Sequence, residues 1–253
     1  MPGKKISVCL IGAGRMGARW VEAMKKHCDI RVLVVTDVNE SEGKKLAELA
    51  GARFALPKTL PWTTSDIDAV FIVTPHKFLF PYAKQALHAG KHVFVEKPGS
   101  RTAAEMRQLL SLARRKRRQL SVGFNYRHFT NIAKAHQMVL DGKIGELLFL
   151  RVVHGHPGRP GYDREWRMKK NEAGGGVLMD QGMHVIDLVN WFLPSKRFRV
   201  ASATQSRLFW KRSDVEEQAF LILKNERAQM ASVQTGVTQW KPVFTLEVYG
   251  NKG

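Results

Sequence analysis

The sequence has 253 residues, of which 44% are hydrophobic, so it can form one large domain or two modest ones. No apolar run approaches the roughly 18 to 20 residues of a membrane span, and the opening MPGKK leads directly into ISVCLI without a signal-peptide pattern. We therefore expect a cytoplasmic protein with no membrane partner. The net charge of +19 favours anionic partners, but it indicates a tendency to associate rather than a fold.

The first half of the chain alternates short apolar strands with helices. Near-continuous Val, Ile and Phe in these strands indicates burial on both faces, as in a parallel sheet covered by helices. The expected strands are Ile6–Ile11, Arg31–Val38, Ala69–Thr74, His92–Val95 and Leu120–Phe124. The expected helices are Met16–Lys26, Glu40–Ala50, Tyr82–Ala89 and Ala103–Arg118. The pattern predicts an α/β class, with a doubly wound domain over residues 1–124.

From residue 125 the pattern changes to one group of helices followed by several strands. We expect a helix at Ile132–Leu140, a strand at Leu147–Val153, a loop rich in Gly and Pro, and a second helix after Gly174–Gly176. The later strands are expected at Val200–Phe209, Gln218–Leu223, Ala228–Gln234 and Phe244–Val248. This order predicts a second, α+β domain over residues 125–253, with a largely antiparallel, open sheet that binds the substrate.

A glycine motif, GAGRMG, follows the first expected strand and begins the first helix. Gly12, Gly14 and Gly17, with Arg15 and Met16 between them, form the G-x-G-x-x-G pattern of a dinucleotide site. In that position the backbone amides and the positive end of the helix dipole receive a pyrophosphate. Asp37, at the end of the second strand, is placed to accept hydrogen bonds from ribose hydroxyls and repels a 2'-phosphate. NAD is therefore the expected cofactor, and NADP is the alternative.

The helix after the three glycines carries polar groups on an otherwise apolar surface. Asp180, His184 and Asp187 follow each other at i, i+4 and i+7, which places them on one stripe of an α-helix. Burying such groups is costly unless they are paired or used. The helix is open to two interpretations, a satisfied structural network and a catalytic acid–base pair.

The loop HGHPGRPGYDREWR, which precedes this helix, is rich in histidine, arginine and aromatic residues. We expect His156, Tyr162 and Trp166 to line a substrate pocket, where aromatic faces and hydrogen-bonding groups suit a polyol. Arg159, Arg164 and Arg167 are the alternative partners of a carboxylate or phosphate on a charged substrate. A metal site formed by His154 and His156 with the helix is not expected, because hydride transfer to NAD needs no metal.

A run of five cations, Arg114–Arg118, resembles a nucleic-acid patch. It closes an amphipathic helix, however, where cations offset the negative end of the helix dipole. No zinc-finger or RNA-motif pattern accompanies the run. We therefore interpret it as a solvated helix end and do not expect a nucleic-acid partner.

Taken together, the glycine motif, Thr74-Pro75, Glu96-Lys97-Pro98 and GGGxxxDxGxHxxD make the chain similar to the glucose-fructose oxidoreductase, inositol dehydrogenase and MocA (Gfo/Idh/MocA) family. The resemblance covers essentially the whole chain. It implies a nicotinamide-dependent oxidoreductase that acts on sugars, cyclitols or their derivatives. Family members usually continue for several dozen residues beyond LEVYGNKG, so we expect the second domain to be incomplete relative to them.

The resemblance also implies roles for individual residues. The implied catalytic group is Lys97, Asp180 and His184. The implied cofactor-binding residues are Gly12, Gly14, Arg15, Met16, Gly17, Asp37, Thr74, Pro75, Glu96 and Lys97. The expected substrate-binding residues are Lys97, Arg127, His156, Tyr162, Trp166, Arg167, Asp180 and His184, with no metal.

The chemistry of alcohol oxidation suits this group. His184 is the expected base, because its pKa lies near working pH, and Asp180 orients the imidazole or binds a substrate hydroxyl. Lys97 follows the carboxyl end of a strand, where it can stabilise a developing alkoxide. Three alternatives stay open: a non-catalytic NAD-binding sensor, a nucleic-acid binder and an NAD-dependent glycoside hydrolase. The resemblance further suggests a homo-oligomer formed through the C-terminal sheet.

Overall fold

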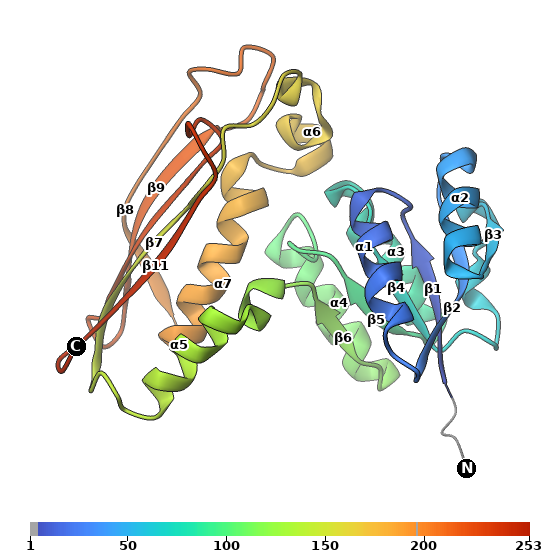
Figure 1. The fold of residues 1–253 in the computed structure, drawn as a ribbon, viewed down its shortest axis with the longest axis horizontal. Coiled ribbons are helices and arrows are strands. Elements are labelled where there is room, and N and C mark those ends of the chain that lie inside the picture. Colours follow the sequence, from blue (N-terminus) through green and yellow to red (C-terminus); the bar gives the residue numbers. More distant parts are fainter. Residues whose placement is uncertain (1–4, 196) are drawn as a thin grey trace. The chain divides into compact units, whose positions relative to one another are not determined.

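The computed structural model describes residues 5–195 and 197–253. The chain forms two compact units, Met1–Gly123 and Phe124–Gly253 (Figure 1). No helix in the described ranges is both long and apolar enough to cross a membrane.

The first unit is built on a six-stranded parallel sheet with the strand order β3-β2-β1-β4-β5-β6. The strands are β1 (Ile6–Ile11), β2 (Ile30–Thr36), β3 (Arg53–Ala55), β4 (Ala69–Ile72), β5 (His92–Val95) and β6 (Leu120–Val122). The helices are α1 (Arg15–Lys25), α2 (Glu40–Ala50), α3 (His76–His88) and α4 (Ala103–Lys116), with short 3-10 turns at η1 (Pro57–Thr59) and η2 (Pro61–Thr63). This is the predicted doubly wound α/β class.

Helices cover both faces of this sheet because alternate strand residues are apolar on each side. Val8 and Leu10 of β1 pack with α1 and α2 in one buried cluster. Cys9 and Ile11, which point to the opposite face, pack with α3 and α4 in a second cluster. The strand order reverses between β1 and β4, and open α/β sheets bind ligands at the carboxyl ends of the strands beside such a reversal.

Two local features of this unit differ from the prediction. Helix α3 begins at His76, six residues before the predicted start, and continues through Pro81. Proline costs a helix one backbone hydrogen bond, but the fully buried Leu79 anchors this turn in the core, and such packing outweighs the loss. The edge strand β3 has only three residues, too few to give a periodic signal.

The second unit contains a five-stranded mixed sheet with the order β11-β7-β10-β9-β8. The strands are β7 (Leu147–Gly155), β8 (Phe198–Ser206), β9 (Gln218–Asn225), β10 (Met230–Gly236) and β11 (Val243–Gly250). Among the described strands of this sheet, the β7–β10 pair is parallel and the other three pairs are antiparallel, so the sheet is largely antiparallel, as predicted. The helical elements are η3 (Asn125–His128), α5 (Thr130–Leu140), η4 (Tyr162–Arg164), η5 (Trp166–Met168), α6 (Lys170–Ala173), η6 (Leu178–Gly182) and α7 (Met183–Phe192).

The two faces of this sheet have different environments. The inner face packs on α5 and α7, with Leu150, Val185 and Val233 among the fully buried residues. The outer face presents Phe220 and Ile222 of β9, which are 41% and 36% exposed. Within the described part of the chain, no helix covers that outer face (Figure 1). The sheet is therefore open on one side.

Candidate active site

The glycine-rich loop passes close to neighbouring backbone. Gly12 has a φ of +111°, and a Cβ atom there would lie 2.8 Å from the carbonyl oxygen of Val73, at the end of β4. A Cβ atom on Gly17 would lie 2.1 Å from the carbonyl oxygen of Gly12. A Cβ atom on Gly14, in contrast, would meet nothing within 4 Å. Glycine is therefore required for packing at two positions and leaves the middle of the loop accessible to a ligand.

The start of α1 fits an anionic group. Gly14 is the N-cap residue, and no described side chain caps the helix there. The first turn also contains no acidic residue, so the amides near Arg15 and Met16 are suited to a phosphate. The Oγ1 atom of Thr74, just after β4, is buried and has no hydrogen-bond partner among the described residues. These features fit a dinucleotide, whose pyrophosphate the loop would hold beside Thr74 and Pro75.

Asp37 links the end of β2 to the glycine-rich loop. Its Oδ2 atom accepts a hydrogen bond of 2.6 Å from the Ala13 amide, and its Oδ1 atom accepts one of 2.7 Å from the Asn39 amide. Each carboxylate oxygen can accept a further hydrogen bond, so both can still receive ribose hydroxyls. The carboxylate thus anchors the glycine-rich loop, which the sequence did not reveal.

We predict that Asp37→Ala weakens NADH binding by roughly 10-fold or more and narrows the preference for NADH over NADPH. The substitution removes charge-assisted hydrogen bonds to the ribose and the repulsion of a 2'-phosphate. Fluorescence titration with both cofactors measures the two affinities. Asn39→Ala is the matched control, because Asn39 caps α2 without contacting the loop through its side chain. An unchanged ratio of the two affinities in Asp37→Ala would contradict the assignment.

The Glu96-Lys97-Pro98 segment follows β5. Both carboxylate oxygens of Glu96 accept hydrogen bonds. Glu96 Oε1 accepts a hydrogen bond of 2.9 Å from the indole Nε1 of Trp20, and Oε2 accepts one of 3.3 Å from the Lys97 amide. Burial raises the pKa of Glu96, and the bond from Trp20 opposes this rise. The Lys97–Pro98 peptide bond is cis. The segment that carries Lys97 is therefore connected to α1 through Trp20.

The polar groups of the second unit lie on a helix with one widened turn. The π-helical segment η6 contains Asp180 and leads directly into α7, which contains His184 and Asp187. All three side chains are buried, with relative exposures of 4%, 8% and 8%. A π turn shifts the register that the sequence implied for a regular α-helix, and such turns are frequent at functional sites.

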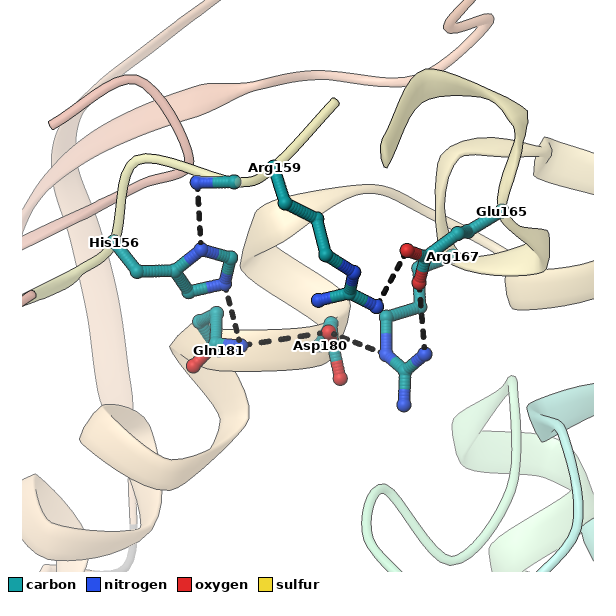
Figure 2. A network of polar contacts seen from close by, with 7 residues as sticks. His156, Arg159, Glu165, Arg167, Asp180 and Gln181 are labelled. Carbon is teal, nitrogen blue, oxygen red and sulfur yellow. Dashed lines mark hydrogen bonds and ion pairs between the residues drawn. The ribbon is translucent and has the colours of Figure 1, made fainter. Parts of the chain in front are cut away.

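Asp180 belongs to a network of ion pairs from the preceding loop (Figure 2). The Nε atom of Arg167 lies 3.3 Å from Asp180 Oδ2. Glu165 joins the network through both oxygens, at 2.5 Å from Arg159 and 3.4 Å from Arg167. Two guanidinium groups therefore face two carboxylates, and the formal charge of the four side chains is zero.

The same network continues to the histidine of the loop. Gln181 Nε2 lies 3.5 Å from Asp180 and 3.4 Å from His156 Nε2 (Figure 2). His156 Nδ1 accepts a hydrogen bond of 3.0 Å from the Gly158 amide. Burial lowers the pKa of His156, which favours the neutral ring that this bond requires. His156 is thereby held beside Asp180.

The two aromatic residues predicted to bind substrate pack against members of this network, and Tyr162 contacts both His156 and Arg159. Tyr162 is 3% exposed and packs in a small apolar cluster with Met168 and Val215. Trp166 is half-buried, with the Arg167 guanidinium 4.4 Å from its ring centroid. Arg127 does not join the Asp180 network.

Arg127 instead pairs with the last carboxylate of the stripe. Its Nε atom donates a 2.7 Å hydrogen bond to Asp187 Oδ2, and its second nitrogen contacts Oδ1 at 2.5 Å. This bidentate pair raises the pKa of Arg127. Asp187, the last carboxylate of the stripe, therefore forms a structural ion pair with Arg127, which the sequence did not predict.

The sequence interpretation did not identify four residues that the structure brings to these sites. They are Trp20, Tyr126, Glu165 and Gln181. In the sequence, Tyr126 precedes Arg127 and Glu165 precedes Trp166. Their position next to a predicted site residue was the only signal that could have identified them. The described residues contain no group of three or more His, Cys, Asp or Glu arranged to hold a metal ion.

These features define an oxidoreductase with a dinucleotide-binding domain, and comparison with known proteins identifies its family. Residues 6–124 match the oxidoreductase family with an NAD-binding Rossmann fold, and residues 132–253 match the GFO/IDH/MocA C-terminal domain. The chain therefore belongs to the Gfo/Idh/MocA family of NAD-binding oxidoreductases. The resemblance drawn from the sequence is confirmed, as is the NAD cofactor.

Individual relatives show how far the similarity extends. The chain is 30% identical to inositol 2-dehydrogenase of Rhizobium meliloti over 73% of its own length and 54% of that protein. It is 27% identical to dTDP-3,4-didehydro-2,6-dideoxy-alpha-D-glucose 3-reductase of Saccharopolyspora spinosa, over 99% of this chain and 74% of the relative. Among solved structures, GenD2 from gentamicin A biosynthesis in complex with NAD matches with a TM-score of 0.93 and 27% identity, covering 100% of this chain and 72% of that one.

Proposed function

We propose that this protein transfers a hydride between a secondary alcohol of an uncharged sugar or cyclitol and NAD. The observation that carries the proposal is the buried pair of Asp180 and His184, on a helix with a π turn, in a chain that also has an NAD-binding domain. When NAD is bound, its nicotinamide supplies the acceptor for the hydride. The protein must then take up the hydroxyl proton and stabilise the reacting oxygen.

Each of the three proposed catalytic residues has a distinct task. His184 accepts the hydroxyl proton during oxidation, since imidazole titrates near neutral pH. Asp180 binds a neighbouring substrate hydroxyl, and its ion pair with Arg167 holds the carboxylate in place. Lys97 donates a hydrogen bond to the reacting oxygen and stabilises alkoxide charge. The role of Lys97 rests on its place after β5 and on the family motif.

The charge balance around Asp180 supports an uncharged substrate. An acidic or nucleotide sugar needs cations in excess, but Arg159 and Arg167 are both paired with Glu165. Releasing Arg167 for a phosphate would break its ion pair with the buried carboxylate of Asp180, which is costly. Among the relatives, inositol 2-dehydrogenase is named for an uncharged cyclitol and the reductase for a dTDP sugar. The zero net charge of the ion-pair network around Asp180 favours an uncharged substrate.

Turnover assays with NAD and a panel of cyclitols, neutral aldoses, sugar acids and nucleotide sugars test this proposal. We expect formation of reduced nicotinamide with neutral polyols and little with the charged compounds. NAD binding without turnover of any compound would support the non-catalytic sensor instead. Cleavage of an aryl glycoside without net formation of NADH would support the glycoside hydrolase.

We also propose that the open face of the C-terminal sheet joins two copies of this chain. Phe220 and Ile222 on β9 and Met230 on β10 are exposed on the outer face of neighbouring strands, and such contiguous apolar surface is typical of an interface. We expect Ile222→Asp to convert a dimer to a monomer in sedimentation experiments. Leu208→Asp is the control, because this 85% exposed residue lies in the loop after β8. A parent protein that sediments as a monomer at all concentrations would contradict this interface.

A further inference from the structure

Tyr126 of η3 lies face to face with the proposed base. Its ring centroid is 4.3 Å from that of His184, and the two planes differ by 14°. The edge of Phe124 approaches the same imidazole, at 6.4 Å and 83°. The imidazole of His184 is therefore enclosed by aromatic rings, with the face of the Tyr126 phenol as its nearest aromatic contact.

Several contacts hold the Tyr126 ring in this position. Its hydroxyl lies within hydrogen-bond distance, 3.0 Å, of His154 Nε2 on β7. Phe129 and Phe244 pack on it at centroid distances of 4.8 and 5.3 Å. Burial and the negative charge of Asp180 raise the pKa of the phenol, so it stays neutral at working pH. The ring therefore presents a fixed, uncharged π face to His184.

Other ionisable groups of the second unit contact the His184 ring, lie on the same continuous helix, or pair with the carboxylates of that helix. They are Asp180 of η6, Asp187 on the same helix, Arg127 and Tyr126 of η3, His154 of β7 and Arg167 of η5. The two carboxylates are each paired with an arginine, which reduces their influence on the imidazole. Tyr126 contacts His184 through its ring, and an imidazolium interacts with a π face more favourably than a neutral imidazole does.

We propose that Tyr126 is a positioning residue for the reaction, which holds the His184 ring by stacking and stabilises the imidazolium formed when His184 accepts the substrate proton. The inference rests on the proposed role of His184 as the base. It assigns to Tyr126 an electrostatic contribution to proton transfer in addition to packing.

Two substitutions separate the ring from the hydroxyl. Tyr126→Met removes the π face but keeps an apolar side chain, and we expect it to lower the pKa of His184 by about half a unit to one and a half units. Tyr126→Phe keeps the ring, so the pKa of His184 should remain near that of the parent. NMR titration of histidine-labelled protein measures these values, and the signal lost in His184→Gln identifies the residue.

The control and a second measurement keep the inference testable whatever the substitutions do to folding. Tyr249→Met removes a tyrosine that stacks on Phe149 instead, and it should leave the pKa of His184 unchanged. In the parent protein, the stacked ring should move the His184 ring-proton signals upfield of those of an exposed histidine such as His88. Absence of that upfield shift, or equal pKa values in the parent and a folded Tyr126→Met protein, would overturn the inference.

A kinetic experiment distinguishes failure of this inference from failure of the proposed function. In an active enzyme, the pH limb of kcat/KM should move to lower pH in Tyr126→Met and return in Tyr126→Phe, with KM little changed. If Tyr126→Met alters the melting temperature and not this limb, the role of Tyr126 is only structural. If the parent lacks turnover, the proposed function fails, but the NMR experiment still decides whether Tyr126 stabilises the imidazolium.

Discussion

Replacing His184 with Asn is expected to lower turnover by roughly 100-fold or more, which is a typical contribution of a positioned proton acceptor. The amide is similar in size to the imidazole but cannot accept a proton at neutral pH. NAD binding and the fold should change little, because the substitution preserves most of the side-chain volume in the 8% exposed site. Circular dichroism, NAD titration and steady-state kinetics measure the three properties.

The pH dependence gives a second test of the same residue. In the parent, kcat/KM should rise with pH through an apparent pKa in the neutral region as His184 loses its proton, and the variant should lack this limb. His136→Asn is the matched control, since His136 also stacks on an aromatic ring, Trp191 at 3.8 Å, in the same unit. A His184→Asn protein that melts early but turns over at the parent rate while folded would exclude His184 as the base and leave Lys97 as the remaining candidate.

Lys97→Met is expected to lower kcat/KM by roughly 100-fold to 1,000-fold across the whole pH range. The methionine keeps much of the side-chain length but cannot donate a hydrogen bond to the reacting oxygen or offset alkoxide charge. Since the base is retained, the neutral limb should stay at the same pH. Rate profiles for both variants, measured with the same substrate, distinguish loss of the base from loss of alkoxide stabilisation.

The control for Lys97 is an exposed lysine of the same unit. Lys84→Met, on α3, should leave both turnover and NAD affinity unchanged. NAD affinity must be measured for Lys97→Met as well, because the sequence motif also implies that Lys97 binds the cofactor. A fall in affinity equal to the fall in kcat/KM would assign Lys97 to cofactor binding alone.

Much of the fold could be predicted because its signals are local. Four of the five buried positions in the strand Ile6–Ile11 are apolar, as in a two-sided sheet, and Gly12 and Gly17 after it match a turn with no room for a Cβ atom. The buried helix with Asp180 and His184 was also visible, because apolar residues surround its polar stripe. Such features depend on the spacing of apolar residues and on the conformational preferences of single residues. Both can be read from the sequence.

The partners of the site residues were decided only by the tertiary structure. Trp20 and Glu96 are 76 positions apart, Arg127 and Asp187 are 60 apart, and Tyr126 reaches both His154 and His184. The sequence shows which side chains must be satisfied if they are buried, but it does not show which distant residues lie within reach. That choice depends on how sheets and helices pack, because a shift in packing or a π turn exchanges one partner for another.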